Sequence, residues 1–216
     1  MHALKFEVIF QKMPSLLEGC AVTLFFCTVS LFFALILGIF LALFRDSKIR
    51  PLALVTKFYI WIFRGTPLMV QLYLIYFGLP SFGITMGPAT AGVIGLSLNT
   101  SAYVAEIIRS GIHAVDPGQR EAAKALGMTY AKEMVRIVAP QAGKVCLLPL
   151  VNQFVSTIKN SSILSVITIT ELTRAGTLIS YSTFRHFEAY IAIAVLYLIL
   201  TTIFTSLAGW IERRMK

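Results

Sequence analysis

The chain has 216 residues, of which 57% are hydrophobic and 13% are charged, about half the charged fraction of an ordinary soluble domain. Its net charge of +9 comes from Lys and Arg residues beside the ends of apolar runs, and no basic stripe interleaved with aromatic residues predicts a nucleic-acid partner. The composition therefore excludes an ordinary soluble protein and a nucleic-acid-binding protein. It predicts an all-α integral membrane protein surrounded by lipid.

Long uncharged runs predict five transmembrane helices, because about 20 apolar residues are needed to cross the hydrocarbon of a bilayer. The first run is too long for the apolar part of a signal peptide, and a basic segment follows it. Glycines and prolines around Pro80 divide the next uncharged stretch into two helices. We expect a single domain over residues 1–216, an irregular segment over 160–187, and spans over residues 17–44, 54–79, 89–108, 145–159 and 188–210.

The distribution of basic residues predicts how these spans are oriented. Lys and Arg concentrate in residues 45–64, in residues 109–144 and in the tail over residues 212–216. Basic segments stay on the cytoplasmic side of a membrane. Because five spans place the two termini on opposite sides, we expect the N-terminus outside and the C-terminus in the cytoplasm.

The polar segment over residues 115–140 is the most informative about function. Asp116 and Pro117 are typical of a helix start, and Gly127 is typical of a helix end or bend. The stretch Glu-Ala-Ala-Lys-Ala-Leu-Gly over residues 121–127 predicts a helix that ends at this glycine and whose alanines leave a face with little bulk, which can lie close against another protein. By itself, the pattern also fits an amphipathic helix that lies along the membrane surface.

This motif, with Pro140 thirteen residues after the glycine, resembles the EAA loop of the permease subunits of ATP-binding-cassette (ABC) importers. Further similarity to the permeases for polar amino acids, the histidine, glutamine and arginine type, extends over nearly the whole chain. That family commonly has an aliphatic residue where Ala139 stands and often a proline where His186 stands. The similar segments are residues 16–24, 63–80, 151–167, 171–176 and 183–190.

The resemblance implies the fold of a type I importer permease in the inner membrane of a bacterium. In that family the EAA loop forms coupling helices that dock into a groove on a cytoplasmic ATPase dimer. The resemblance also implies a periplasmic or lipid-anchored substrate-binding protein and a second permease subunit, either a copy or a paralogue. It assigns the contact with the ATPase to Glu121, Ala122, Ala123 and Gly127.

The sequence lacks the glycine-rich loop GxxxxGK[ST] that cradles phosphates in ATPases. We therefore expect a transport subunit without catalytic residues, metal ligands or a cofactor of its own, and ATP and Mg²⁺ bound by a partner chain. A stand-alone amino acid transporter driven by an ion gradient is the alternative. It requires carboxylates inside the membrane, yet Glu18, Glu106 and Glu188 lie near the ends of the predicted spans.

Polar residues inside the spans are candidates for the substrate path, since such residues are costly in a membrane without partners, water or cargo. In the fourth span, Asn152, Ser156 and either Lys159 or Asn160 recur at helical spacing and share a face that fits an amino acid. Hydrogen bonding between helices is the alternative, and both interpretations stay open. The full set of candidates is Asn152, Gln153, Ser156, Thr157, Lys159 and Asn160, with Gln71 and Asn99 as weaker ones.

Two charged groups near the cytoplasmic end of the third span are expected to be structural. Glu106 and Arg109 are three residues apart, which favours an ion pair on the helix surface. Arg64 is expected to anchor its span at the lipid headgroups or to contact the coupling region.

Overall fold

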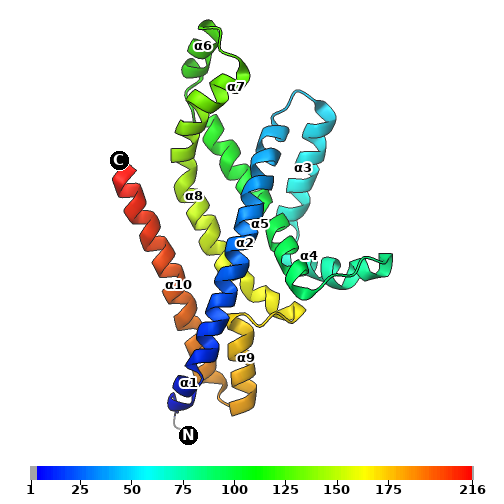
Figure 1. Ribbon diagram of the computed structural model, residues 1–216, viewed down its shortest axis with the longest axis vertical. Coiled ribbons are helices and arrows are strands. Elements are labelled where there is room, and N and C mark those ends of the chain that lie inside the picture. The colour runs from blue at the N-terminus through cyan, green and yellow to red at the C-terminus, as the bar shows by residue number, and fades with distance from the viewer. Residues whose placement is uncertain (1–3, 216) are drawn as a thin grey trace.

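The computed structural model describes residues 4–215, and this part of the chain is helical and contains no β-strand. Four long helical segments are apolar enough to cross a membrane, and they correspond to α2 (Met13–Arg45), α5 (Pro88–His113), α8 (Ala139–Asn160) and α10 (His186–Met215), which Figure 1 labels. The third segment is longer than α8 and runs from Tyr130 to Ile167. Helix α3 (Arg50–Gly65) and the segment Leu68–Phe82, which begins with α4 (Leu68–Tyr73), form a bent pair. When this pair is counted as one span, the number of candidate spans is five. The predicted all-α membrane architecture is confirmed.

Shorter elements connect the spans. A π-helical turn η1 (Leu74–Gly78) and a 3₁₀ turn η2 (Leu79–Phe82) continue α4, and the 3₁₀ segment η4 (Ser161–Ile167) continues α8. Helices α6 and α7 lie at one end of the molecule, whereas α1, α9 and the start of α10 lie at the other (Figure 1). The remaining elements are α1 (Glu7–Gln11), α6 (Pro117–Ala125), α7 (Tyr130–Glu133), the π-helical turn η3 (Met134–Val138) and α9 (Leu172–Thr183).

Small residues allow α2 and α5 to pack closely along their length. A Cβ atom placed on Gly38 of α2 would lie 2.5 Å from Cγ1 of Val104 on α5. Farther along the same contact, the Ser30 hydroxyl lies 3.5 Å from the carbonyl oxygen of Val93, to which it donates a hydrogen bond. Within a membrane, helices associate through such close packing and through hydrogen bonds between helices. The α2–α5 pair therefore forms the central axis of the molecule.

A buried carboxylate organises the end of the molecule opposite α6. Glu171 precedes α9 and accepts hydrogen bonds from the backbone N–H groups of Thr173 and Arg174, both at 2.8 Å. The hydroxyl of Tyr197 on α10 donates a third hydrogen bond to it, at 2.9 Å. The N–H of Leu172 donates to the Thr23 hydroxyl on α2. These bonds join α2, α9 and α10.

The structure corrects two expectations about helix continuity. Residues 54–79 were expected to form one span, but α3 and the α4–η2 segment meet at an angle of 108°. Pro67 has no N–H and disfavours a helical conformation for Thr66, whose φ and ψ of −118° and 148° are extended. Residues 160–187 are more regular than expected, since they contain η4 and α9. Lys216 of the predicted basic tail lies outside the described residues.

The contact between α2 and α9 yields a test of this packing. Gly19→Ala is expected to destabilise the protein by about 1–3 kcal/mol, because overpacking forces backbone shifts. The new Cβ would lie 2.9 Å from the Cα atom of Leu172, and backbone atoms cannot move aside as a flexible side chain can. Gly209→Ala is the matched control, since nothing lies within 4 Å of its Cβ position. Equal thermal unfolding midpoints for the two purified variants in detergent would contradict the close contact.

Candidate functional site

The predicted coupling segment folds as a short helix that projects from one end of the bundle (Figure 1). Asp116 caps α6, since its Oδ1 atom accepts a hydrogen bond from the N–H of Gly118, and Pro117 occupies the first turn. Gly127 follows the helix with a φ of +71°, a left-handed conformation that favours glycine. The helix start and end expected from the sequence are both confirmed.

The exposed surface of this segment differs from the set of residues that the resemblance assigns to it. Glu121, Ala122 and Gly127 are exposed, whereas Ala123 is only 1% exposed. Leu126, which the sequence analysis did not single out, is 82% exposed, and Tyr130 and Val135 are also exposed. The sequence feature that could have identified Leu126 is its position, since it is an apolar residue directly before the glycine that ends the helix.

An ion pair between a partly exposed arginine and a buried carboxylate holds α6 against the helix that follows it. Nε of Arg120 lies 2.7 Å from the Glu133 carboxylate, and the Glu133 side chain is almost completely buried. Removing Arg120 would leave the buried Glu133 carboxylate without a partner, which is destabilising. The loop is therefore a folded unit that presents a defined surface.

The candidates for the substrate path on α8 separate into open and buried positions. Asn152, Lys159 and Asn160 are exposed on the chain, and Gln153 and Ser156 are partly buried. Thr157 is buried instead, and its hydroxyl donates to the Gln153 carbonyl at 2.9 Å and lies 3.4 Å from the Thr100 hydroxyl on α5. Thr157 thus packs α8 against α5, while Asn152 and Lys159 remain open to a ligand or another subunit.

The two weaker candidates, Gln71 and Asn99, form a buried pair at the break between α3 and α4. Nδ2 of Asn99 donates to the Gln71 side-chain oxygen at 3.0 Å and to the Phe63 carbonyl at 3.1 Å. Nε2 of Gln71 lies 3.0 Å from the Phe63 carbonyl oxygen and 3.1 Å from that of Thr66. The two amides therefore satisfy carbonyls that the interrupted helix leaves without partners.

The charged residues near the end of α5 pair across helices and not within α5. Glu106 binds Arg45 at the end of α2 and Arg64 at the end of α3, so the expected pair between Glu106 and Arg109 is wrong. Arg109 instead binds Asp46 at 2.9 Å, because the chain after α2 approaches it from a neighbouring helix. Sequence spacing cannot reveal such partners, since they depend on tertiary packing.

Asp46 is the centre of a second charged cluster at this end of the bundle. Its carboxylate lies 2.9 Å from Nε of Arg109 and 2.6 Å from Nε2 of His113. Partial burial raises the pKa of Asp46, but the hydrogen bonds from Arg109 and His113 outweigh burial and hold the pKa below its usual value. The carboxylate is therefore ionised at neutral pH and ties the α2–α3 loop to α5.

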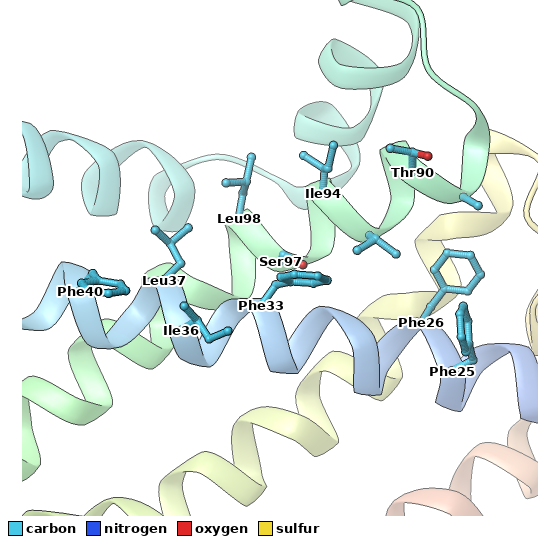
Figure 2. A pocket seen from close by; sticks show the side chains of 12 residues that line it. Phe25, Phe26, Phe33, Ile36, Leu37, Phe40, Thr90, Ile94, Ser97 and Leu98 are labelled. Carbon is cyan, nitrogen blue, oxygen red and sulfur yellow. The ribbon is translucent and has the colours of Figure 1, made fainter.

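A large groove between α2 and α5 is unsuited to a polar ligand. Figure 2 shows it lined by aromatic and aliphatic side chains, among them Phe25, Phe33 and Ile94, and its volume is 690 Å³. Ser97 is one of its few polar residues, and its hydroxyl has no hydrogen-bond partner within residues 4–215. A zwitterion would lose its hydration here without gaining partners. The open face of α8 remains the better candidate for cargo.

The different burial of two asparagines provides a test. Asn99→Ala is expected to destabilise the purified protein by about 1–2 kcal/mol, because carbonyls at the α3–α4 break lose a donor. Asn152→Ala is the control, since the Asn152 side chain is exposed and its loss should leave the thermal unfolding midpoint unchanged. If the midpoint fell equally in both variants, the amide pair at the break would not have the role described.

Comparison with known proteins places this arrangement in a family. The model of the family described as "Binding-protein-dependent transport system inner membrane component" matches residues 34–216. The arginine transport system permease protein ArtQ of Bacillus subtilis (strain 168) is 41% identical over 214 residues, which is 99% of this chain and 98% of ArtQ.

Solved structures support the same assignment. A chain in a crystal structure of an amino acid ABC transporter with histidines superposes with a TM-score of 0.93 at 45% identity, covering 99% of this chain and 100% of that one. An inward-facing MetNI methionine ABC transporter matches with a TM-score of 0.77 at 21% identity over 94% of this chain and 97% of that one, which shows the fold alone. The chain belongs to the family of binding-protein-dependent transport system inner membrane components.

Proposed function

We propose that this chain is the path-forming permease subunit of an ABC importer for polar amino acids, and that α6 couples it to a separate ATPase. The observation that carries the proposal is the exposed surface of α6, which projects beyond the membrane-spanning helices (Figure 1). A small helix with Glu121 and Ala122 exposed, followed by the exposed Leu126, fits a groove on another protein. ATP and Mg²⁺ would be bound by that partner.

The proposed orientation places α6 and α7 in the cytoplasm. It is supported by the basic residues of the α2–α3 loop and of residues 109–144, which cluster at the end of the molecule that carries α6. The α9 end then faces outward, where a substrate-binding protein would deliver cargo. Helix α1, the first helix of the chain, lies at that end (Figure 1).

Cargo would pass along the open face of α8. Asn152 and Ser156 offer amide and hydroxyl groups to a zwitterion, and Lys159 offers a cation to its carboxylate. One bundle of this size does not enclose a path by itself, so this face would meet a second permease subunit at a symmetric interface. ATP-driven closure of the ATPase dimer would move α6 and rock the two permease subunits between inward-open and outward-open states. The names of the relatives support amino acids as cargo.

An ion-driven transporter is a weaker explanation of the same helices. Such a transporter needs an intramembrane carboxylate that is free to bind its coupling ion. Glu106 is bound by two arginines, and Glu171 already accepts three hydrogen bonds. Uptake by this chain alone in energised vesicles would favour the ion-driven mechanism.

Changes at the coupling surface test the proposal. Glu121→Arg and Gly127→Val are each expected to lower ATP-dependent uptake in reconstituted vesicles at least about tenfold, a loss of roughly 1.4 kcal/mol at the contact. The first reverses an exposed charge, and the second places a β-branched residue at a φ of +71°. Lys132→Ala, an exposed change in the same segment, should retain uptake. Normal uptake and normal stimulated ATPase activity in both coupling variants would overturn the proposal.

Accessibility to a membrane-impermeant maleimide tests the orientation. The cysteine of Lys132→Cys is expected to react only in inverted membrane vesicles, and that of Ser182→Cys, near the end of α9, only in right-side-out vesicles. The natural residues Cys20, Cys27 and Cys146 are buried and should give little background. The opposite pattern would place α6 outside the cell, where no ATPase could reach it.

A further inference from the structure

A polar cleft opens between α2, α3 and α5, separate from both the coupling surface and the α8 face. Its volume is 430 Å³. Arg45 enters it from the end of α2, and Glu106 enters it from α5. The α3 side contributes Lys57, Trp61 and Arg64, which lie on one side of that helix because they recur at spacings of four and three.

The cleft carries excess positive charge after its internal pairing is counted. Glu106 neutralises one charge while it binds both Arg45 and Arg64, whose Nη1 atom lies 3.3 Å from Oε1 of Glu106. The guanidinium of Arg64 also lies 5.3 Å from the centre of the Tyr103 ring, yet its side chain remains 44% exposed.

The other charges around the cleft leave this excess in place. Lys57 is exposed and forms no ion pair within residues 4–215. The nearby carboxylate of Asp46 is occupied by Arg109 and His113. The cleft therefore contains three cations and one acid, which leaves a net charge of two positive units that is available to an anion. The cations are Arg45, Lys57 and Arg64, and the acid is Glu106.

The rim of the cleft is apolar and aromatic. Trp61 is 71% exposed, and its ring stacks on that of Phe58 with 5.9 Å between the centroids. Leu54 lies one turn before Phe58 and is also exposed, which extends the apolar stripe along α3. Exposed tryptophan is enriched where lipid headgroups meet the hydrocarbon. The stripe and the cations together match a molecule with an anionic head and an apolar body.

We propose that this cleft binds the headgroup phosphate of an anionic phospholipid from the cytoplasmic leaflet, with Lys57 and Arg64 as its main ligands. The proposal rests on the orientation given under the proposed function. Basic pockets between transmembrane helices on the cytoplasmic side are suited to anionic headgroups. A free phosphate ion would use the same cations but would leave Leu54, Phe58 and Trp61 without a role. The bound lipid would bridge the end of α3 and the helices that hold Arg45 and Glu106.

The test measures lipid binding directly in the protein purified with its co-purifying subunits. The sample is placed in phosphatidylcholine nanodiscs that contain increasing fractions of phosphatidylglycerol, and bound lipid is counted by native mass spectrometry. Lys57→Gln combined with Arg64→Gln should raise the half-saturating fraction about fivefold for each cation removed. Lys48→Gln combined with Arg50→Gln removes the same charge from the exposed α2–α3 segment outside the cleft and should leave binding unchanged.

The outcomes separate the possible sources of the anion. Equal binding by all three proteins, or equal loss in both double variants, would overturn the site. Inorganic phosphate and glycerol phosphate are added as soluble competitors, and so is glutamine. Displacement of the lipid by any of these at millimolar concentration would assign the cleft to a soluble ligand and overturn the lipid proposal.

The single variant Lys57→Gln keeps the site testable if the double variant misfolds. Lys57 is exposed, and its replacement leaves the Arg64–Glu106 pair in place. About a fivefold weakening is expected for this single variant, and unchanged binding would contradict the proposal. Uptake measured on the same preparations reports on the proposed function separately. Normal uptake without lipid binding would overturn the proposed lipid site alone. Lipid binding without uptake would overturn only the proposed transport function.

Discussion

Hydrocarbon offers no hydrogen bonds, so each backbone carbonyl inside the membrane needs a donor from the protein itself. The break between α3 and α4 is where this requirement is hardest to meet, because Pro67 supplies no N–H and Thr66 is extended. Gln71 and Asn99 meet it with side-chain amides, one from α4 and one from α5. The 108° bend, and with it the direction of α4, therefore depends on an asparagine in a neighbouring span.

At the α6 end of the bundle, ion pairs join neighbouring helices as the amide hydrogen bonds do at the α3–α4 break. Glu106 joins α5 to α2 and α3 through Arg45 and Arg64, and Asp46 joins the α2–α3 loop to α5 through Arg109. The two carboxylates thus fix three helices near the level where the proposed orientation places the lipid headgroups. Excess cations beside Glu106 explain why one region can both hold helices together and attract an anion.

Much of the fold was predictable because membrane spans leave a strong signal in sequence. Uninterrupted apolar residues indicated α2 and α10 directly, and Asp116 with Gly127 indicated both ends of α6. The bend at Pro67 was missed because proline is tolerated in membrane helices whenever a neighbour supplies donors, and sequence spacing does not show Asn99 lying there. The burial of Ala123 was missed for a related reason, since it depends on how α6 folds back on the residues that follow it.

The hydrogen bonds of Glu171 also constrain how the α9 end of this protein can move. Two of them come from the start of α9 and move with it, whereas the third comes from Tyr197 on α10. Sliding α9 along α10 would therefore remove one donor from a buried carboxylate, which is costly. The Leu172–Thr23 bond adds α2 to the same block. Any movement at this end of the bundle is therefore expected to carry α2, α9 and α10 together as one block.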